Sequence, residues 1–246
     1  TSFGVRARHL AAKGAPIAAG FRVNVLQIGD QAAPQLAVLP GDDFVVSFID
    51  SFGTGWTRRL AANGDPRSGI PERRANTTTK GDQTELQVAA APSGAVLATW
   101  QSPVPLKDAT EIMARVVSSD GAPASPEIVV NTITVGAQIQ PAVAASAFGF
   151  AVAWVSGTNS YTLEYQRVSE AGQKVGGPVL VTTATDWQED PVVALSDSGD
   201  IVVGWATSGE VFVQRFGPDD SATSAIAIPS AAVVHERRKP ALGLDA

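Results

Sequence analysis

The chain has 246 residues, of which 44% are hydrophobic and 17% charged, with a formal net charge of −6 and a pI near 4.9. This acidic balance argues against a nucleic-acid partner held by phosphate contacts, and no apolar run is long enough to span a bilayer. Because the sequence contains no cysteine, disulfides, thiolate metal sites and cysteine nucleophiles are excluded together.

The predicted elements begin inside a repeat that is already under way, because Leu10–Pro16 closely matches Leu60–Pro66. Further along, each copy contains four short apolar segments with β-branched and aromatic residues and local alternation of period two, which favours strands over helices. We name these strands a, b, c and d in chain order. Strand a (191–195) and strand b (201–205) show the pattern clearly, joined by a polar, Gly-containing connection typical of a hairpin.

Two columns of residues give the length of the repeat. The aromatic residue that closes strand b falls at Phe48, Trp100, Trp154 and Trp205, with spacings of 52, 54 and 51 residues. The glutamine that precedes strand a falls at Gln31, Gln83, Gln138 and Gln188, with spacings of 52, 55 and 50 residues. Because the two columns agree, the chain is an array of similar β units of about fifty residues.

Four antiparallel strands in a repeat of this length predict an all-β, five-bladed β-propeller in which each blade covers the faces of its neighbours. We expect one domain, residues 1–246, with one blade lacking a strand. Its repeats are expected at about 1–33 together with 240–246, then 34–85, 86–140, 141–190 and 191–239. Two arrangements remain open: the last strand a, Pro240–Leu244, returns to join the first c and d strands, or the blades run in the order c, d, a, b.

Several segments resemble a known kind of repeat. The run Val130-Asn131-Thr132, followed by Gln138, by 141–144 and by 150–154, is similar to propeller-like repeats of about fifty residues in large bacterial secreted and surface proteins, which are often associated with RTX or adhesin modules. The resemblance implies an extracellular or cell-surface setting in a bacterium. It brings no catalytic residues with it.

Three columns are candidates for ligand contacts, and each also has a structural interpretation. The Trp residues are either platforms for sugar rings or packing between blades, and we favour packing. The glutamines Gln31, Gln83, Gln138 and Gln188 either point their amides at a ligand or tie the crossover into strand a, which we favour. The column of Arg59, Arg167 and Arg215 either clamps acidic glycans or forms a ladder of paired or solvated strand residues.

Catalytic and metal constellations are sparse. The two histidines, His9 and His235, are far apart and lack the spacing of metal ligands. The carboxylates considered for catalysis lie mostly at turns and crossovers, where solvated acids are the default: Asp42, Asp43, Asp50, Asp186, Glu189, Asp190, Asp197 and Asp200. We therefore expect no catalytic residues, no metal site and no cofactor.

The sequence thus predicts a non-catalytic extracellular or cell-surface module for adhesion or assembly, with a protein or glycan surface as partner. One alternative is a lectin with a site repeated in each blade. Another is a glycosidase with paired carboxylates at the central channel. Self-association through the incomplete blade is a further expectation.

Overall fold

The computed structural model describes residues 2–65, 71–78, 80–118, 122–157, 161–184, 189–207, 210–228 and 241–242. All the regular elements in these residues are β-strands, and strands that pair within a sheet are antiparallel and consecutive in the chain. The described residues include no helix of the length and apolarity that crossing a membrane requires.

Within the described residues, eighteen strands form five sheets, which we call blades 1 to 5 in chain order. Blade 1 has two strands, β1 (Arg6–Ala7) and β2 (Phe21–Arg22). Blade 2 has four: β3 (Gln31–Val38), β4 (Phe44–Asp50), β5 (Gly55–Leu60) and β6 (Arg73–Arg74). Blade 3 has four: β7 (Thr84–Ala90), β8 (Val96–Pro103), β9 (Thr110–Val117) and β10 (Ile128–Val129). Blade 4 has four: β11 (Ala137–Ser146), β12 (Gly149–Gly157), β13 (Tyr161–Val168) and β14 (Lys174–Ala184). Blade 5 has four: β15 (Glu189–Leu195), β16 (Ile201–Ala206), β17 (Val211–Phe216) and β18 (Ile226–Ile228).

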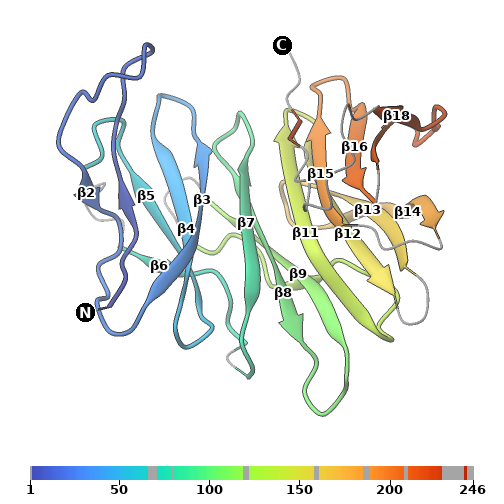
Figure 1. Cartoon of the computed structure of the whole chain (residues 1–246), viewed down its shortest axis with the longest axis horizontal. Helices are drawn as coiled ribbons and strands as arrows, with labels where there is room; N and C mark the ends of the chain where they lie inside the picture. Colours follow the sequence, from blue (N-terminus) through green and yellow to red (C-terminus); the bar gives the residue numbers. More distant parts are fainter. Residues whose placement is uncertain are drawn as a thin grey trace.

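The blades follow one another along the long axis of the molecule, with blade 1 at one end and blade 5 at the other (Figure 1). Strands β3, β7, β11 and β15, the first strands of blades 2 to 5, lie next to one another in this order. We call them the inner strands. This arrangement agrees with the predicted all-β class and with the predicted repeat of four strands.

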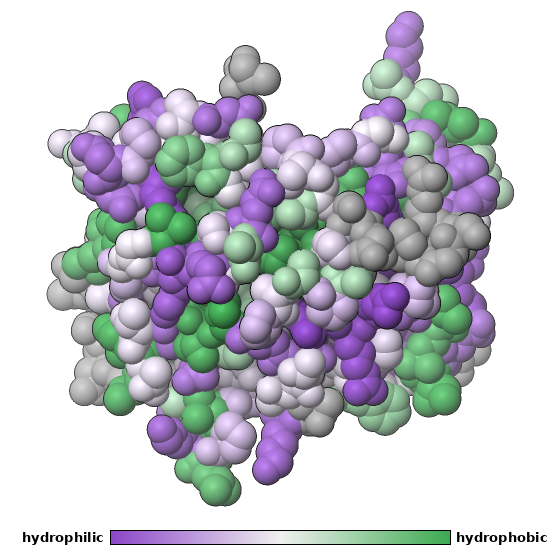
Figure 2. Space-filling view, turned by 180° about the vertical axis from the view of Figure 1, so that it is seen from behind, coloured by the Kyte–Doolittle hydropathy of each residue, from purple (hydrophilic) through white to green (hydrophobic). Residues whose placement is uncertain are grey.

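The core consists of the layers between successive blades. On β12, Phe150, Val152 and Trp154 pack against blade 3, and the alternate residues Ala151 and Ala153 pack against blade 5. All five are at most 1% exposed, because a strand between two sheets must be apolar on both of its faces. On the side opposite to the view of Figure 1, polar and apolar residues are interspersed (Figure 2).

The strand expected at Pro240–Leu244 lies mostly outside the described residues. Ala241 and Leu242 are described, and neither belongs to a strand. Leu242 packs against Gly204 of β16, so it lies over the face of blade 5.

Candidate functional site

The inner strands share an irregularity near their first residues. In each of β3, β7, β11 and β15 the pairing register shifts at a β-bulge. Each bulge contains a residue other than glycine with a positive φ: Ala33 (51°), Glu85 (55°), Gln140 (55°) and Asp190 (47°). Left-handed conformations of such residues are uncommon and cluster at functional sites, where bulges re-aim side chains.

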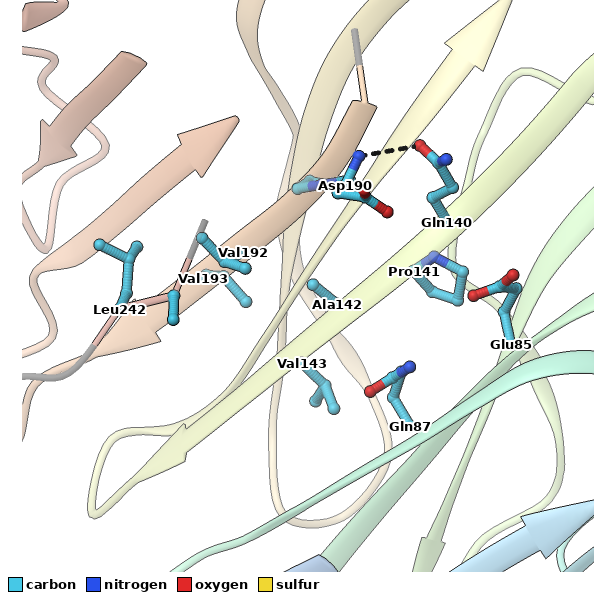
Figure 3. Close-up of a pocket in the computed structure, with 12 residues that line it drawn as sticks. Glu85, Gln87, Gln140, Pro141, Ala142, Val143, Asp190, Val192, Val193 and Leu242 are labelled. Atoms are coloured by element: carbon cyan, nitrogen blue, oxygen red, sulfur yellow. Dashed lines mark hydrogen bonds between the residues drawn. The ribbon is translucent and has the colours of Figure 1, made fainter. Parts of the chain in front are cut away.

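Three of these four bulges surround one pocket. Glu85 and Gln87 come from β7, Gln140 and Pro141 from β11, and Asp190 from β15. Apolar residues complete the lining, namely Ala142, Val143, Pro191, Val192, Val193, Ala241 and Leu242 (Figure 3). The pocket has a volume of about 360 Å³, within the range of small-ligand sites. We call it the axial pocket, because the inner strands line it.

The polar groups of the axial pocket are partly fixed by one another. The backbone N–H of Asp190 donates to the amide oxygen of Gln140 at 3.2 Å, which connects β15 with β11 (Figure 3). The Glu85 side chain is exposed at the mouth, whereas Asp190 and Gln140 are half-buried. The described lining contains two carboxylates and two primary amides and no basic residue. Such a set accepts hydrogen bonds from hydroxyl or ammonium groups, and the amides also donate them.

The glutamine column does not line this pocket. Gln31, Gln83 and Gln138 are buried, with at most 4% of each residue exposed. The amide oxygens of Gln83 and Gln138 accept hydrogen bonds from the indole Nε1 of Trp100 and Trp154, each at 3.0 Å. This geometry favours a structural role in which each amide holds the start of its inner strand to the next strand. Gln188 lies outside the described residues.

Blade 2 has Phe48 in place of the tryptophan, and its glutamine bonds differently. The Gln31 amide oxygen accepts from Asn24 Nδ2 at 2.7 Å, and its nitrogen donates to the Gly29 carbonyl at 2.9 Å. Trp100, Trp154 and Trp205 are at most 3% exposed, so their rings pack between blades and present no open platform. Sequence reasoning missed the Trp–Gln bond, because it requires the register of the first hairpin of each blade.

The arginine column is paired within the protein. The carboxylate partners are Asp43 for Arg59 and Asp220 for Arg167, both at 2.8 Å, and Asp200 for Arg215 at 3.1 Å. Of the three, Arg215 has the most exposed side chain, at 62%, so its ion pair contributes little to stability. This geometry favours the paired-ladder interpretation.

Arg167 connects blades 4 and 5. Its guanidinium donates to the carbonyls of Gly199 and Gly217 at 2.9 and 2.8 Å, in addition to Asp220. The Tyr165 hydroxyl donates to the same carboxylate at 2.7 Å. Burial and the Asp220 carboxylate raise the pKa of Tyr165 above its usual value. The cluster therefore uses its charges and donors internally.

A further column, of buried asparagines, has a structural role that the sequence pattern does not indicate. The Asn24 side chain accepts the backbone N–H of Val5, just before β1, at 2.9 Å. Asn76 and Asn131 accept the N–H of Gly55 in β5 and of Ile112 in β9, both at 2.8 Å. Each side-chain nitrogen also donates to a carbonyl two residues later. The spacing of the three asparagines, 52 and 55 residues, was the available signal.

Of the carboxylates considered from the sequence, Asp190 lies in the axial pocket. Asp43 pairs with Arg59, and Asp50 accepts backbone N–H groups in a tight turn. Asp186 and the side chain of Glu189 lie outside the description. Within the described part of the chain, no group of three potential metal ligands of the His, Cys, Asp or Glu type occurs.

Carboxyl groups with shifted pKa values lie away from the pocket. Burial raises the pKa of Glu164 on β13, and a hydrogen bond from Thr162 partly offsets this. A hydrogen bond from Ser198 holds the pKa of Asp200 below its usual range, and Ser221 does the same for Asp219. The last two groups are turn residues whose neighbours favour the charged form.

Comparison with known proteins supports the fold. A thermostable family-43 glycoside hydrolase aligns with a TM-score of 0.50 and 11% identity, over 84% of this chain and 74% of that one. The Dos1 propeller aligns with a TM-score of 0.55 and 12% identity, over 94% of this chain and 55% of the propeller. A neuraminidase-like protein (flat-faced bat, Peru) aligns with a TM-score of 0.50 and 9% identity, over 91% of this chain and 58% of that one. No family model matches the chain, and no curated protein matches it either.

These likenesses are too distant in sequence to carry an activity, but they confirm the predicted fold class. The protein has the architecture of a five-bladed β-propeller. Blade 1 is represented by two strands in the described residues, and the strand expected at Pro240–Leu244 to complete it lies mostly outside them.

Proposed function

We propose that the chain is a non-catalytic glycan-binding propeller, with one ligand site in the axial pocket. The observation that carries the proposal is the convergence of Glu85, Gln140 and Asp190, each on a strained bulge of a different inner strand. This differs from a lectin with one site in every blade, because the polar residues of three blades contribute to one cavity.

The lining suits a sugar. Carboxylates and amides bind hydroxyl groups through directed hydrogen bonds, and the C–H faces of a sugar ring pack against apolar side chains such as Pro141, Val143 and Val192. Because the described lining carries two carboxylates without a basic residue, acidic sugars are repelled. The ligand is therefore a neutral or amino-substituted saccharide.

Titration calorimetry with ligands found on a glycan array tests the site. Replacing Glu85 by Gln or Asp190 by Asn weakens binding about tenfold or more, because a hydrogen bond to a charged group contributes about 1.5–3 kcal/mol. Glu210→Gln is the matched control, since Glu210 is an exposed carboxylate in blade 5 that does not line the pocket. Equal binding by the pocket variants and the wild type rejects the site.

The two carboxylates on one pocket also favour a second candidate, a glycosidase. Such enzymes use a carboxyl group as acid and a carboxylate as base or nucleophile. Glu85 and Asp190 supply two such groups from β7 and β15. Release of chromophore from a panel of aryl glycosides, abolished by both Glu85→Gln and Asp190→Asn, would replace the non-catalytic proposal with this one.

We place the protein outside the cell or on its surface, where a glycan-binding site serves adhesion. The support is the resemblance of its repeats to those of bacterial secreted and surface proteins. Fractionation of the native host with an antibody against the chain tests the placement. Recovery in the cytosol alone contradicts it.

A further inference from the structure

Leu106, at the tip of the hairpin between β8 and β9, combines two unfavourable features. Its side chain is fully exposed, so folding buries none of its apolar surface. Its backbone has a positive φ of 63°, which a leucine adopts only with strain. Outside the four bulges, the other described non-glycine residues with a positive φ are Asp42 and Asp220, and aspartate tolerates this conformation better. Because such strain persists mainly where it serves a function, the Leu106 side chain is a candidate for contact with another molecule.

Backbone hydrogen bonds define the turn that carries Leu106. The N–H of Lys107 donates to the Val104 carbonyl at 3.2 Å, and the N–H of Val104 donates to the Ala109 carbonyl at 2.9 Å. Pro105 followed by a residue with a positive φ is the pattern of a type II turn, in which the residue after the proline is normally glycine or asparagine. The turn would therefore form more easily with either of these residues than with leucine.

The hairpin between β4 and β5 presents a second apolar tip, Phe52, whose side chain is 64% exposed. The Asp50 carboxylate accepts the N–H groups of Phe52 and Thr54, both at 2.9 Å. It also accepts the indole N–H of Trp56 at 2.8 Å. The backbone that carries the Phe52 ring is thus already ordered, so a contact made by this ring loses little further conformational freedom.

The two hairpins lie side by side at one end of the molecule, the lower end in Figure 1. The crossover from β6 to β7 lies between them: the N–H of Gln83 donates to the Gly53 carbonyl at 3.0 Å, and Gly81 lies against Pro103. The crossovers from β2 to β3 and from β10 to β11 flank the pair, and both are described. Both tips therefore project beyond segments that surround them on either side.

The first hairpins of the same two blades, at the opposite end, have ordinary turns. Their tips are Pro-Gly-Asp at 40–42 in blade 2 and Pro-Ser-Gly at 92–94 in blade 3. These residue types are the usual ones in exposed turns. In blades 2 and 3, a bulky apolar tip therefore occurs on the second hairpin and not on the first.

Charged residues of both signs surround the two apolar tips. Lys107 and Asp108 follow Leu106, and Lys80 and Asp82 lie on the crossover between the hairpins. All four are exposed. A zwitterionic lipid headgroup, with one phosphate and one quaternary ammonium, offers an opposite charge to each of them. The chain as a whole has a formal net charge of −6, so a strongly anionic surface repels it.

We propose that this end of the molecule docks on a lipid bilayer with zwitterionic headgroups, with Leu106 and Phe52 inserted at the boundary between headgroups and acyl chains. On a protein partner, each of these separate projecting side chains would need a matching pocket, whereas a fluid lipid layer admits both without one. Insertion buries apolar surface that folding leaves in water. The docking is peripheral and independent of the axial pocket.

Cosedimentation with vesicles of phosphatidylcholine, which carry no saccharide, tests the proposal. The bound fraction of the wild type rises with lipid concentration and changes little with added salt, because burial of apolar side chains is not screened. At low salt it falls when part of the lipid is replaced by phosphatidylglycerol, because the anionic surface repels the acidic chain.

Leu106→Asn removes the apolar tip and supplies a residue that suits a positive φ. We expect its partition into the vesicles to fall about tenfold. Its melting temperature is at least as high as that of the wild type, because the backbone strain is reduced. Leu180→Asn is the matched control: Leu180 is 53% exposed on β14, the outer strand of blade 4, and this variant binds like the wild type. The double variant Phe52→Ser/Leu106→Asn does not sediment with the vesicles.

Leu106→Trp shows where the tip lies in the bound state. Its fluorescence emission shifts to shorter wavelength on vesicles. Lipids brominated on their acyl chains quench its emission more strongly than they quench the emission of the wild type, because tryptophan at this position sits at the membrane interface.

Four results overturn the proposal: a wild type that binds phosphatidylcholine at no lipid concentration, a Leu106→Asn variant that binds like the wild type, a Leu180→Asn variant that loses as much binding, or binding that requires anionic lipid. Association of copies in the absence of lipid, abolished by Leu106→Asn, would assign the tips to a protein contact and also overturn it.

Discussion

The inner strands β3 and β7 are the first strands of consecutive blades, but their neighbours differ. Strand β7 packs against the four-stranded blade 2, whereas β3 lies next to blade 1, which has two strands in the described residues. The alternation of apolar residues is similar in both, so the sequence sets which way each side chain points. Burial differs because blade 2 covers β7 with four strands, whereas the described part of blade 1 covers blade 2 with two. In a repeat protein, the contribution of a residue therefore depends on the adjacent unit as much as on its own.

The largest expected loss of stability follows from a substitution in the buried layer between blades 3 and 4. Trp154→Ala removes a side chain that is fully buried and leaves the Gln138 amide oxygen without its indole donor. We expect a loss of about 3–5 kcal/mol in the free energy of unfolding. Urea denaturation measures it. Phe52→Ala, at a ring that is 64% exposed, is the control and changes stability by less than about 0.5 kcal/mol.

The asparagine column tests whether blade 1 and blade 3 differ in hydrogen bonding as well as in packing. Asn24→Ala in blade 1 and Asn131→Ala in blade 3 each leave a buried backbone N–H without an acceptor. Both lose about 1–3 kcal/mol of stability, and the loss at Asn24 is the larger, because its Nδ2 also donates to the Gln31 amide oxygen at 2.7 Å. Denaturation curves showing a much smaller loss for Asn24 would mean that blade 1 unfolds separately.

The comparison is sharpest at equivalent positions of β3 and β7. Val88→Ala deletes two buried methyl groups and lowers the free energy of unfolding by about 1.5 kcal/mol, whereas Leu36→Ala changes it by less than about 0.5 kcal/mol. Both are measured on dilute protein, where self-association is absent. Equal losses would show that Leu36 is covered in solution even in a single chain.

The smallest expected change in stability is the pH-dependent contribution of Glu164. Glu164 is 7% exposed, and burial raises its pKa in the folded state above the model-peptide value of 4.5. The folded state thus holds this proton more tightly than the unfolded state, so the Glu164 contribution lowers stability as pH rises through the window above 4.5.

Glu164→Gln keeps an acceptor for the Thr162 hydroxyl and removes the buried charge. At neutral pH the variant is more stable than the wild type, and the two converge below pH 4.5. Thermal unfolding at a series of pH values measures the difference. A variant that is less stable at neutral pH would contradict the assignment of burial as the cause.

The repeated columns were sufficient to predict the strands and the propeller, because apolar alternation and aromatic spacing reflect packing between blades. The sequence pattern places the starts of two inner strands too late. It predicts Pro141 and Pro191 as first residues, whereas β11 and β15 begin upstream of them, at Ala137 and Glu189. A proline is tolerated within these strands because it lies within a bulge, where the ladder is interrupted.

The axial pocket was not predictable in the same way. Its bulge residues occupy one column but are of three different types, namely Glu85, Gln140 and Asp190, and the fourth member of the column, Ala33, does not line the pocket. The columns that did repeat, the glutamines and arginines, repeat because they hold each blade together. Asp190 was considered only as one of several acids near turns, and Glu85 was not considered.

The bulges have a consequence for how this protein changes over generations. Three of them, at Glu85, Gln140 and Asp190, fix the backbone at the rim of the axial pocket, and their side chains line the cavity. Exchanges among unbranched side chains at these three positions therefore alter what the cavity recognises, whereas valine, isoleucine and threonine are disfavoured by the left-handed backbone. The ligand specificity of the pocket can therefore change while the fold is retained, and a new ligand preference requires few substitutions.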